Sequence, residues 1–267
     1  MERLKEIERS IIKKYRKEIW SKYVKGVKEF EMIKENDKIA VCISGGKDSF
    51  LLAKCMQELL RHKKFHYELE FIVMNPGYNE ENIIKIKENL KILGIDAHIF
   101  DTPIFDVADK TDNPCYLCAR MRRGYLYSYA QKLGCNKIAL GHHFDDVIET
   151  ILMNILYTGN YASMMPKLHS DNFKCMELIR PLYFVREKDI KSWAKYNGLE
   201  FIDCACSVTK KKIGKRQEVK ELVQKLNEMY KEADKCIFAS SFNVNLNTVI
   251  GYKKGNEKYT FMDDYDM

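Results

Sequence analysis

Apolar residues recur every three or four positions from residue 4 to residue 30. This spacing predicts one long amphipathic helix at the start of the chain. Many Lys and Arg residues, among them Lys13, Lys14 and Arg16, lie between the apolar positions. We expect the apolar face to pack on the rest of the protein, with contact to RNA phosphates as a secondary role of the basic face.

Short apolar runs and helical patterns then alternate along the chain. The apolar runs predict strands, and the three-to-four spacing predicts helices between them. The strands are expected at 38–43, 68–74, 95–100 and 137–140, and the helices at 50–61, 79–93, 115–133 and 147–156. Alternation at this spacing is typical of βαβ units on a parallel sheet. The sequence therefore predicts an α/β fold with a doubly wound, Rossmann-like parallel sheet.

The second half of the chain contains weaker patterns. Residues 101–114 are expected to form a loop, and 166–169 with 174–179 a hairpin. A helix at 187–196, a short strand at 200–202, a last helix at 218–233 and a frayed acidic tail complete the expected elements. We divide the chain into an N-terminal helical arm (1–36), a nucleotide-binding domain (37–207) and a small C-terminal helical extension (208–267).

Composition narrows the class of protein. The 267 residues carry a net charge of +7, and the basic residues gather in the N-terminal helix and at 210–216. RNA is a reasonable partner for such a distribution. No apolar run approaches the roughly 20 residues of a membrane span, and the N-terminus lacks an apolar signal segment. We expect a cytoplasmic protein that binds no membrane.

The turn after the first predicted strand suggests a phosphate site. It reads Ser44-Gly45-Gly46-Lys47-Asp48-Ser49 and leads into a helix. Strand, glycine turn and helix in this order direct free backbone N–H groups and the helix dipole at one point. The glycines let the backbone approach a pyrophosphate, the two hydroxyls donate to its oxygens, and Lys47 offsets its charge. Asp48 is expected to cap the helix or to help hold Mg²⁺.

A second loop, at 141–146, follows the fourth predicted strand. In a doubly wound sheet it faces the glycine turn where the winding reverses. We therefore expect Asp145 to hold Mg²⁺ or to orient the reacting carbonyl, and Asp146 to cap the following helix. Met74, at the end of the second predicted strand, and Gly141, just after the fourth, are assigned to the same ATP site.

Nine cysteines without a secretory signal argue against a disulfide framework. Five isolated ones are expected to be small buried hydrophobic residues. These are Cys42, Cys55, Cys135, Cys175 and Cys236. The close pairs Cys115/Cys118 and Cys204/Cys206 suit a redox dithiol, a zinc site or an iron–sulfur site, and composition does not choose among these.

Longer motifs resemble a known family. The hexapeptide at 44–49 resembles the PP-loop of the N-type ATP pyrophosphatases, which adenylate a carbonyl oxygen. Cys115-Tyr-Leu-Cys-Ala-Arg-Met-Arg-Arg-Gly-Tyr-Leu-Tyr127 and Ile138-Ala-Leu-Gly-His-His-Phe-Asp-Asp146 are similar to segments of the TtcA group of tRNA thiolation enzymes. Segments 166–171, 179–182 and 186–190 also match in kind, so that the resemblance covers about 30–206.

The resemblance implies a chemistry and a set of residues. ATP and Mg²⁺ would adenylate a pyrimidine carbonyl of tRNA, and sulfur would then replace its oxygen at a [4Fe-4S] cluster. The implied cluster ligands are Cys115, Cys118 and Cys206, with Cys206 also taken as catalytic and Cys204 as an extra thiol. Arg122 is taken as a catalytic phosphate contact.

The resemblance also implies partners and a product. Besides tRNA, a sulfur donor (sulfide or a cysteine desulfurase) and a homodimer are implied. The product expected is 2-thiocytidine in the anticodon loop, and the second candidate is thiolation of another tRNA uridine by the same chemistry. The motifs would also suit a zinc-containing PP-loop ligase or amidotransferase, or a non-catalytic RNA-binding iron–sulfur protein.

Overall fold

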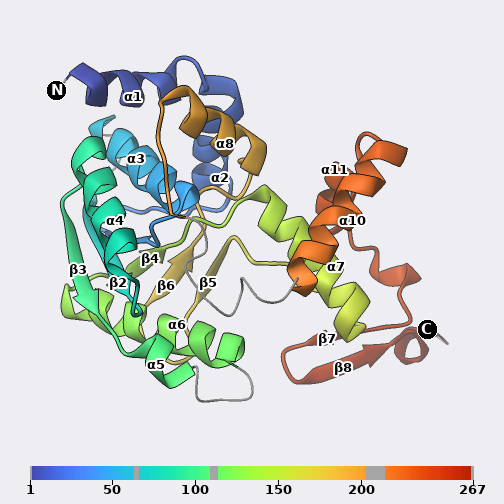
Figure 1. Ribbon diagram of the computed structural model, residues 1–267. Coiled ribbons are helices and arrows are strands. Elements are labelled where there is room, and N and C mark those ends of the chain that lie inside the picture. The colour runs from blue at the N-terminus through green and yellow to red at the C-terminus, as the bar shows by residue number, and fades with distance from the viewer. Residues whose placement is uncertain (1, 63–65, 109–113, 203–213, 266–267) are drawn as a thin grey trace.

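A six-stranded, mostly parallel sheet lies at the centre of the molecule (Figure 1). The structure is a computed structural model, and it describes residues 2–62, 66–108, 114–202 and 214–265. The strands are β1 (Lys38–Ile43), β2 (Glu68–Asn75), β3 (Ala97–Asp101), β4 (Lys137–Ala139), β5 (Lys167–His169) and β6 (Glu177–Ile179). Their order is β3-β2-β1-β4-β6-β5, and only β5 pairs antiparallel. The predicted doubly wound α/β fold and the predicted hairpin are confirmed.

Helices cover both faces of this sheet. On one face lie α3 (Lys47–Arg61), α4 (Glu80–Leu93), α7 (Phe144–Thr158) and α8 (Glu187–Tyr196), whose buried residues join one core with Ile39, Val41 and Ile43 of β1. On the other face α6 (Pro114–Lys132) packs Tyr127 and Ala130 against Ala40 and Cys42. Successive residues of β1 therefore serve opposite cores, as the two-residue period of a strand requires.

The N-terminal helix is broken where one continuous helix was expected. It consists of α1 (Glu2–Ile12), a π-helical turn η1 (Arg16–Trp20) and α2 (Ser21–Glu29). Tyr15 N–H donates to Ser10 O, and Trp20 N–H to Tyr15 O, across five residues each. The wider turn keeps Tyr15, Ile19 and Trp20 all buried. The apolar spacing fits a plain α-helix nearly as well, so it did not reveal the break.

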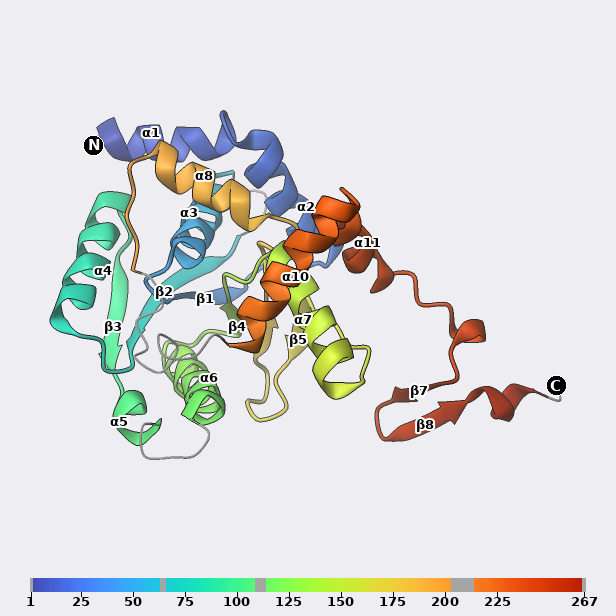
Figure 2. The same cartoon turned by 45° about the vertical axis from the view of Figure 1, so that its right-hand side comes forward.

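The C-terminal region differs most from expectation. The predicted last helix is two helices, α10 (Lys215–Met229) and α11 (Ala233–Ser240). A hairpin of β7 (Gly251–Lys254) and β8 (Glu257–Thr260), flanked by η2 (Leu246–Thr248) and η3 (Phe261–Asp264), had not been predicted, and it extends away from the α/β body (Figure 2). Residues 200–202 form no strand, and the expected loop contains the short helix α5 (Ile104–Ala108).

Burial in the core tests the expectations for the isolated cysteines and for the domain boundaries. Cys42, Cys55 and Cys135 are buried as expected, whereas Cys175 and Cys236 are exposed. One core cluster includes Ile11 of α1 and Val219 of α10 together with the central helices. The boundaries at 36/37 and 207/208 therefore stay a prediction. Among the helices of the described residues, none combines the length and apolar character that crossing a membrane requires.

Candidate functional site

The glycine turn joins β1 to α3 and is held in shape by Ser49. The Ser49 hydroxyl accepts from Ser44 N–H at 3.1 Å and donates to Gly46 O at 2.8 Å. Gly45 has φ +89°, and a Cβ there would lie 2.5 Å from Cδ1 of Ile202. Only glycine fits this position. Gly46 is the N-cap residue of α3 and offers no side-chain cap, so the first N–H groups of the helix are available to an anion.

The loop between β4 and α7 lies directly against this turn. A Cβ at Gly141 would lie 3.0 Å from Ser49 N and 3.1 Å from Asp48 C. The close approach occurs where the strand order reverses between β1 and β4. The two loops thus meet at the switch point where doubly wound sheets bind ligands.

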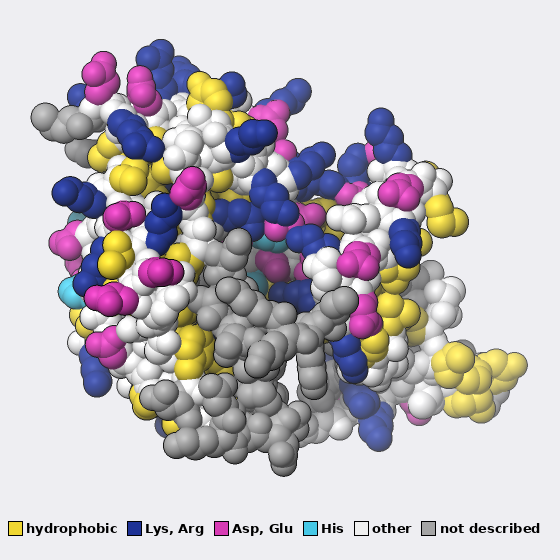
Figure 3. Space-filling model, viewed as in Figure 1, with side chains coloured by type: hydrophobic (Ala, Val, Ile, Leu, Met, Phe, Trp, Pro, Cys, Tyr) yellow, Lys and Arg dark blue, Asp and Glu magenta, His cyan; other side chains and the backbone are white. Residues whose placement is uncertain are grey.

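Two adjoining cavities open at this junction. The smaller, of about 280 Å³, is lined by Ser44, Asp48, Ser49, Met74, Gly141 and Arg122, all assigned to the site from sequence, and also by His142 and Asp146. The larger, of about 920 Å³, adds Gly46 and Lys47 and is bordered by α8. Figure 3 shows Lys and Arg side chains gathered around a hollow on this face, with acidic side chains within it.

Two carboxylates of the smaller cavity suit a divalent cation. Oδ1 of Asp48 is buried, and no described residue offers it a hydrogen bond. Asp146 lines the same cavity; its Oδ2 accepts from His143 N–H at 2.9 Å in the capping box of α7, which leaves Oδ1 toward Arg216. Carboxylate oxygens are the ligands that Mg²⁺ prefers. The expected capping role of Asp146 is observed, and its second oxygen faces the site.

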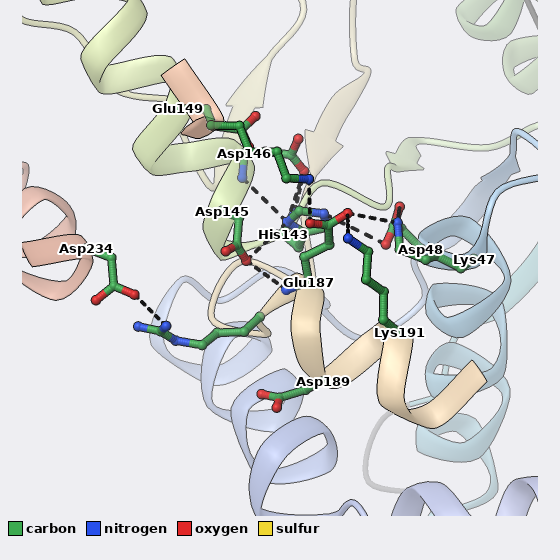
Figure 4. A network of polar contacts seen from close by, with 12 residues as sticks. Lys47, Asp48, His143, Asp145, Asp146, Glu149, Glu187, Asp189, Lys191 and Asp234 are labelled. Atoms are coloured by element: carbon green, nitrogen blue, oxygen red, sulfur yellow. Dashed lines mark hydrogen bonds and ion pairs between the residues drawn. The ribbon is translucent and has the colours of Figure 1, made fainter. Parts of the chain in front are cut away.

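Asp145 takes a different contact from the one expected. Its Oδ2 accepts from the backbone N–H of Glu187 at 2.7 Å, so the side chain is directed at the first turn of α8 (Figure 4). It lines neither of the two cavities described above. A reaction role for Asp145 stays a prediction, and Asp48 and Asp146 are the better-placed acids.

Glu187 ties the glycine turn to two further lysines (Figure 4). It lies 3.2 Å from Nζ of Lys47, 3.1 Å from that of Lys191 and 2.6 Å from that of Lys220. Burial alone would raise the pKa of Glu187, but Lys220, Lys47 and Lys191 outweigh it and lower this pKa to about 2. Burial lowers the pKa of Lys47, and Asp48 and Glu187 overcome this and raise it. Lys47 therefore stays cationic beside the turn.

His142 contributes a neutral imidazole to the smaller cavity. Burial lowers its pKa to about 4, with Arg180 acting in the same direction. Nδ1 accepts from Nε of Arg180 at 3.4 Å. In the neutral ring the proton is then on Nε2. The sequence assigned no role to this residue.

Arg216, on α10, reaches the site from the C-terminal region. It lies 3.4 Å from Oδ1 of Asp146 and 3.6 Å from Oε2 of Glu149. Burial, with help from Asp146, raises the pKa of Glu149 to about 7. Sequence reasoning assigned the run ending at Arg216 to RNA contact only, because nothing in the sequence shows which helix faces the site.

The cysteine assignment falls largely outside the described residues. Cys118 lies on α6, four residues before Arg122, whose side chain lines both cavities. Cys115 lies in the same helix, but its side chain is outside the described part, as are Cys204 and Cys206 entirely. The implied cluster ligands stay a prediction.

Comparisons with known proteins give relatives for most of the chain. The profile of the PP-loop domain family matches residues 15–226. The chain is 39% identical to the tRNA-cytidine(32) 2-sulfurtransferase of Syntrophotalea carbinolica over 76% of its length and 80% of the relative's. It is 36% identical to that of Geobacter metallireducens over 87% and 91%. The fold is similar to the U34-tRNA thiolase NcsA of Methanococcus maripaludis, solved with its [4Fe-4S] cluster, with TM-score 0.66, 23% identity and coverage of 88% and 80%.

Proposed function

Since the chain belongs to the PP-loop domain family and to its tRNA-cytidine(32) 2-sulfurtransferases, we propose that it replaces the 2-oxygen of cytidine 32 in tRNA by sulfur. ATP is the activating reagent. The observation that supports this most is the close contact between the glycine turn and Gly141, which brings a phosphate-binding turn and two adjoining cavities together at one switch point.

Activation of the carbonyl is the first half of the reaction. The carbonyl oxygen of the base forms a bond to the α-phosphorus of ATP, and the bond to pyrophosphate breaks. The first N–H groups of α3, Ser44 and Lys47 hold the phosphates and the departing pyrophosphate. Asp48 and Asp146 would hold Mg²⁺, which neutralises phosphate charge.

Sulfur delivery is the second half. Cys115, Cys118 and Cys206 supply a donor set of three thiolates, which suits a [4Fe-4S] cluster with one iron left open. Such a cluster would supply a position at which sulfide is held for transfer to the adenylated carbon, from which AMP departs. Arg122, one turn after Cys118, lines both cavities and would balance phosphate charge there.

A tRNA substrate also implies where the enzyme acts and how it binds. Because the substrate is tRNA, we infer a cytoplasmic enzyme whose basic surfaces bind phosphates in a salt-sensitive manner. The sulfur donor is sulfide or a cysteine desulfurase, and the working form is a homodimer. Anaerobic purification separates this from a zinc-containing ligase: a colourless protein with stoichiometric zinc would contradict the cluster.

Mass spectrometry of tRNA nucleosides from a deletion strain tests the function. We expect 2-thiocytidine to be missing and to return with the wild-type gene or with Cys204→Ala, but not with Cys206→Ala. Loss of a different thionucleoside would support ATP-dependent thiolation but would show that another tRNA nucleotide is modified. Unchanged thionucleosides would contradict the function, and cluster loss in Cys204→Ala alone would contradict the ligand assignment.

A further inference from the structure

α10 lies in the C-terminal extension, yet two of its charged side chains reach the candidate ATP site. Arg216 contacts Asp146 and Glu149 of α7, and Lys220, one turn later, contacts Glu187. Val219 and Val223 of the same helix are buried in the main core. Apolar packing therefore holds the helix in place while its neighbouring charged face is presented to the site.

The present contacts of Arg216 are those of a side chain that can change partners. Both are longer than the roughly 2.7–2.9 Å of strong charge-assisted hydrogen bonds. Its side chain is 50% exposed, so solvent screens the pairing. A guanidinium has five N–H donors, and most of those of Arg216 remain for another acceptor. The ion pairs alone do not explain an arginine at this position.

Besides contacting Asp146 and Glu149, Arg216 also lines the larger cavity. Arg216 lines it together with four other cations, Lys47, Arg122, Lys191 and Lys195. Nε of Arg122 is buried, and within the described residues it has no hydrogen-bond acceptor. Such a donor costs free energy unless a ligand supplies the acceptor. Converging cations with an unsatisfied guanidinium donor are typical of a site for phosphate.

We propose that Arg216 holds a substrate phosphate group in this cavity and leaves Asp146 and Glu149 when it does so. The phosphate comes from ATP or from the tRNA backbone, and the inference rests on the proposed function for these two substrates. Departure of Arg216 also frees Oδ1 of Asp146, on the side of the smaller cavity. The C-terminal extension thus contributes a substrate-positioning residue to a site otherwise built by the α/β domain.

Two binding measurements distinguish the sources of the phosphate. One is the Kd of an ATP analogue with a methylene group between its α- and β-phosphates, measured by calorimetry at pH 8 without tRNA. The other is the Kd of the tRNA, measured by filter binding without nucleotide. We expect Arg216→Ala to weaken one of them by about 10-fold to 100-fold, as loss of a hydrogen bond to a charged group does. A nucleotide effect assigns the phosphate to ATP, and a tRNA effect assigns it to tRNA.

Matched variants separate phosphate binding from a structural ion pair. Lys225→Ala, an exposed lysine on the same helix and outside the basic run at 210–216, should bind both ligands as wild type does. Glu149→Gln should leave binding unchanged or tighten it, because it releases Arg216. If Arg216 only braces α7, Glu149→Gln should weaken binding as Arg216→Ala does, and this result would overturn the proposal.

Folding and the proposed function are controlled separately. Thermal unfolding shows whether Arg216→Ala is folded, and Arg216→Lys, which keeps the charge, should lose less affinity and gives the same test if Ala unfolds the protein. Changes below twofold in both Kd values for a folded variant would overturn the inference. If the Arg216→Ala change weakens one of the two ligands as expected but the wild-type protein forms no thiocytidine, the proposed function alone is contradicted.

Discussion

Two basic helical regions flank the α/β domain, and they use their charges differently. In the N-terminal region, Ile7, Ile11 and Tyr23 are buried, and Glu8 binds Lys54 and Arg61 of α3. Lys54 lies about two turns into α3. In α10, fewer residues are buried, and Arg216 and Lys220 contact acids of the candidate site.

The difference teaches that basic composition alone does not identify a substrate-binding helix. What distinguishes the two regions is the location of their charged partners. The partners of α1 lie within α3 and keep two helices together, whereas those of α10 line or adjoin the cavities. Damage to the first region should reduce stability, and damage to the second should reduce substrate binding.

The largest expected effect is on stability, in the N-terminal region. Ile11→Ala removes a fully buried side chain and should lower the free energy of unfolding by about 2–5 kcal/mol, since a cavity remains. Urea unfolding measures this change. The Kd of the ATP analogue for the folded protein should not change. A loss of affinity equal to that of Arg216→Ala would break the comparison.

The Glu8 ion pairs should show a defined pH dependence. Burial raises the pKa of Glu8, but hydrogen bonds from Arg61 and Lys54 outweigh it and leave the pKa below its usual 4.5. Glu8→Gln should cost about 1–3 kcal/mol near pH 7, because Lys54 stays buried beside a weaker acceptor.

The direction of this pH dependence follows from the linkage between proton binding and folding. A carboxylate with a lowered pKa stabilises the protein above its unfolded-state pKa, and this contribution is lost as the pH falls through the folded-state pKa. The difference in unfolding free energy between wild type and Glu8→Gln should therefore shrink as the pH falls below about 4.5. A difference that stays constant down to pH 2.5 would contradict the assigned ion pairs.

Lys220→Ala should have a smaller effect, and on binding rather than on folding. Its side chain is partly exposed, so the unfolding free energy should fall by less than about 1 kcal/mol. Glu187, released from Lys220, holds Lys47 more strongly, and ATP-analogue affinity should fall about twofold to fivefold. Lys225→Ala, an exposed lysine on the same helix, is the control. Equal losses of ATP-analogue affinity in both variants would mean that the affinity depends on the positive charge of α10 and not on the contact between Lys220 and Glu187.

The smallest effect is expected from the C-terminal hairpin. A chain ending at Asn243 lacks β7 and β8, whose residues are almost all exposed. Its unfolding free energy should stay within about 1 kcal/mol of wild type, and its ATP-analogue affinity should not change. A large loss of unfolding free energy or of ATP-analogue affinity would show that the rest of the C-terminal region also contributes to folding or binding.

The sequence predicted the parts of the molecule that local patterns encode. The apolar run of β1, the glycine turn and the alternation of strands and helices together predicted the sheet and the place of its switch point. The π-helical turn at Arg16–Trp20 was missed because apolar spacing hardly separates it from an α-helix.

The site was less predictable, because its contacts join distant segments. The contact of Asp145 with Glu187 and those of Arg216 with Asp146 and Glu149 link positions 42 to 70 residues apart. Neither charge nor periodicity specifies such pairs. A motif such as the glycine turn carries its own geometry, whereas a pair of this kind depends on how the helices pack.

ATP-dependent activation of tRNA is the proposed role of the β1–β4 junction. It is tested most directly by anaerobic incubation of the wild-type protein with tRNA from the deletion strain, sulfide, Mg²⁺ and ATP labelled at the α-phosphate. Labelled AMP should form only when tRNA is present, in a one-to-one ratio to thiocytidine. Absence of AMP with every tRNA fraction, or release of ADP in its place, would contradict the account.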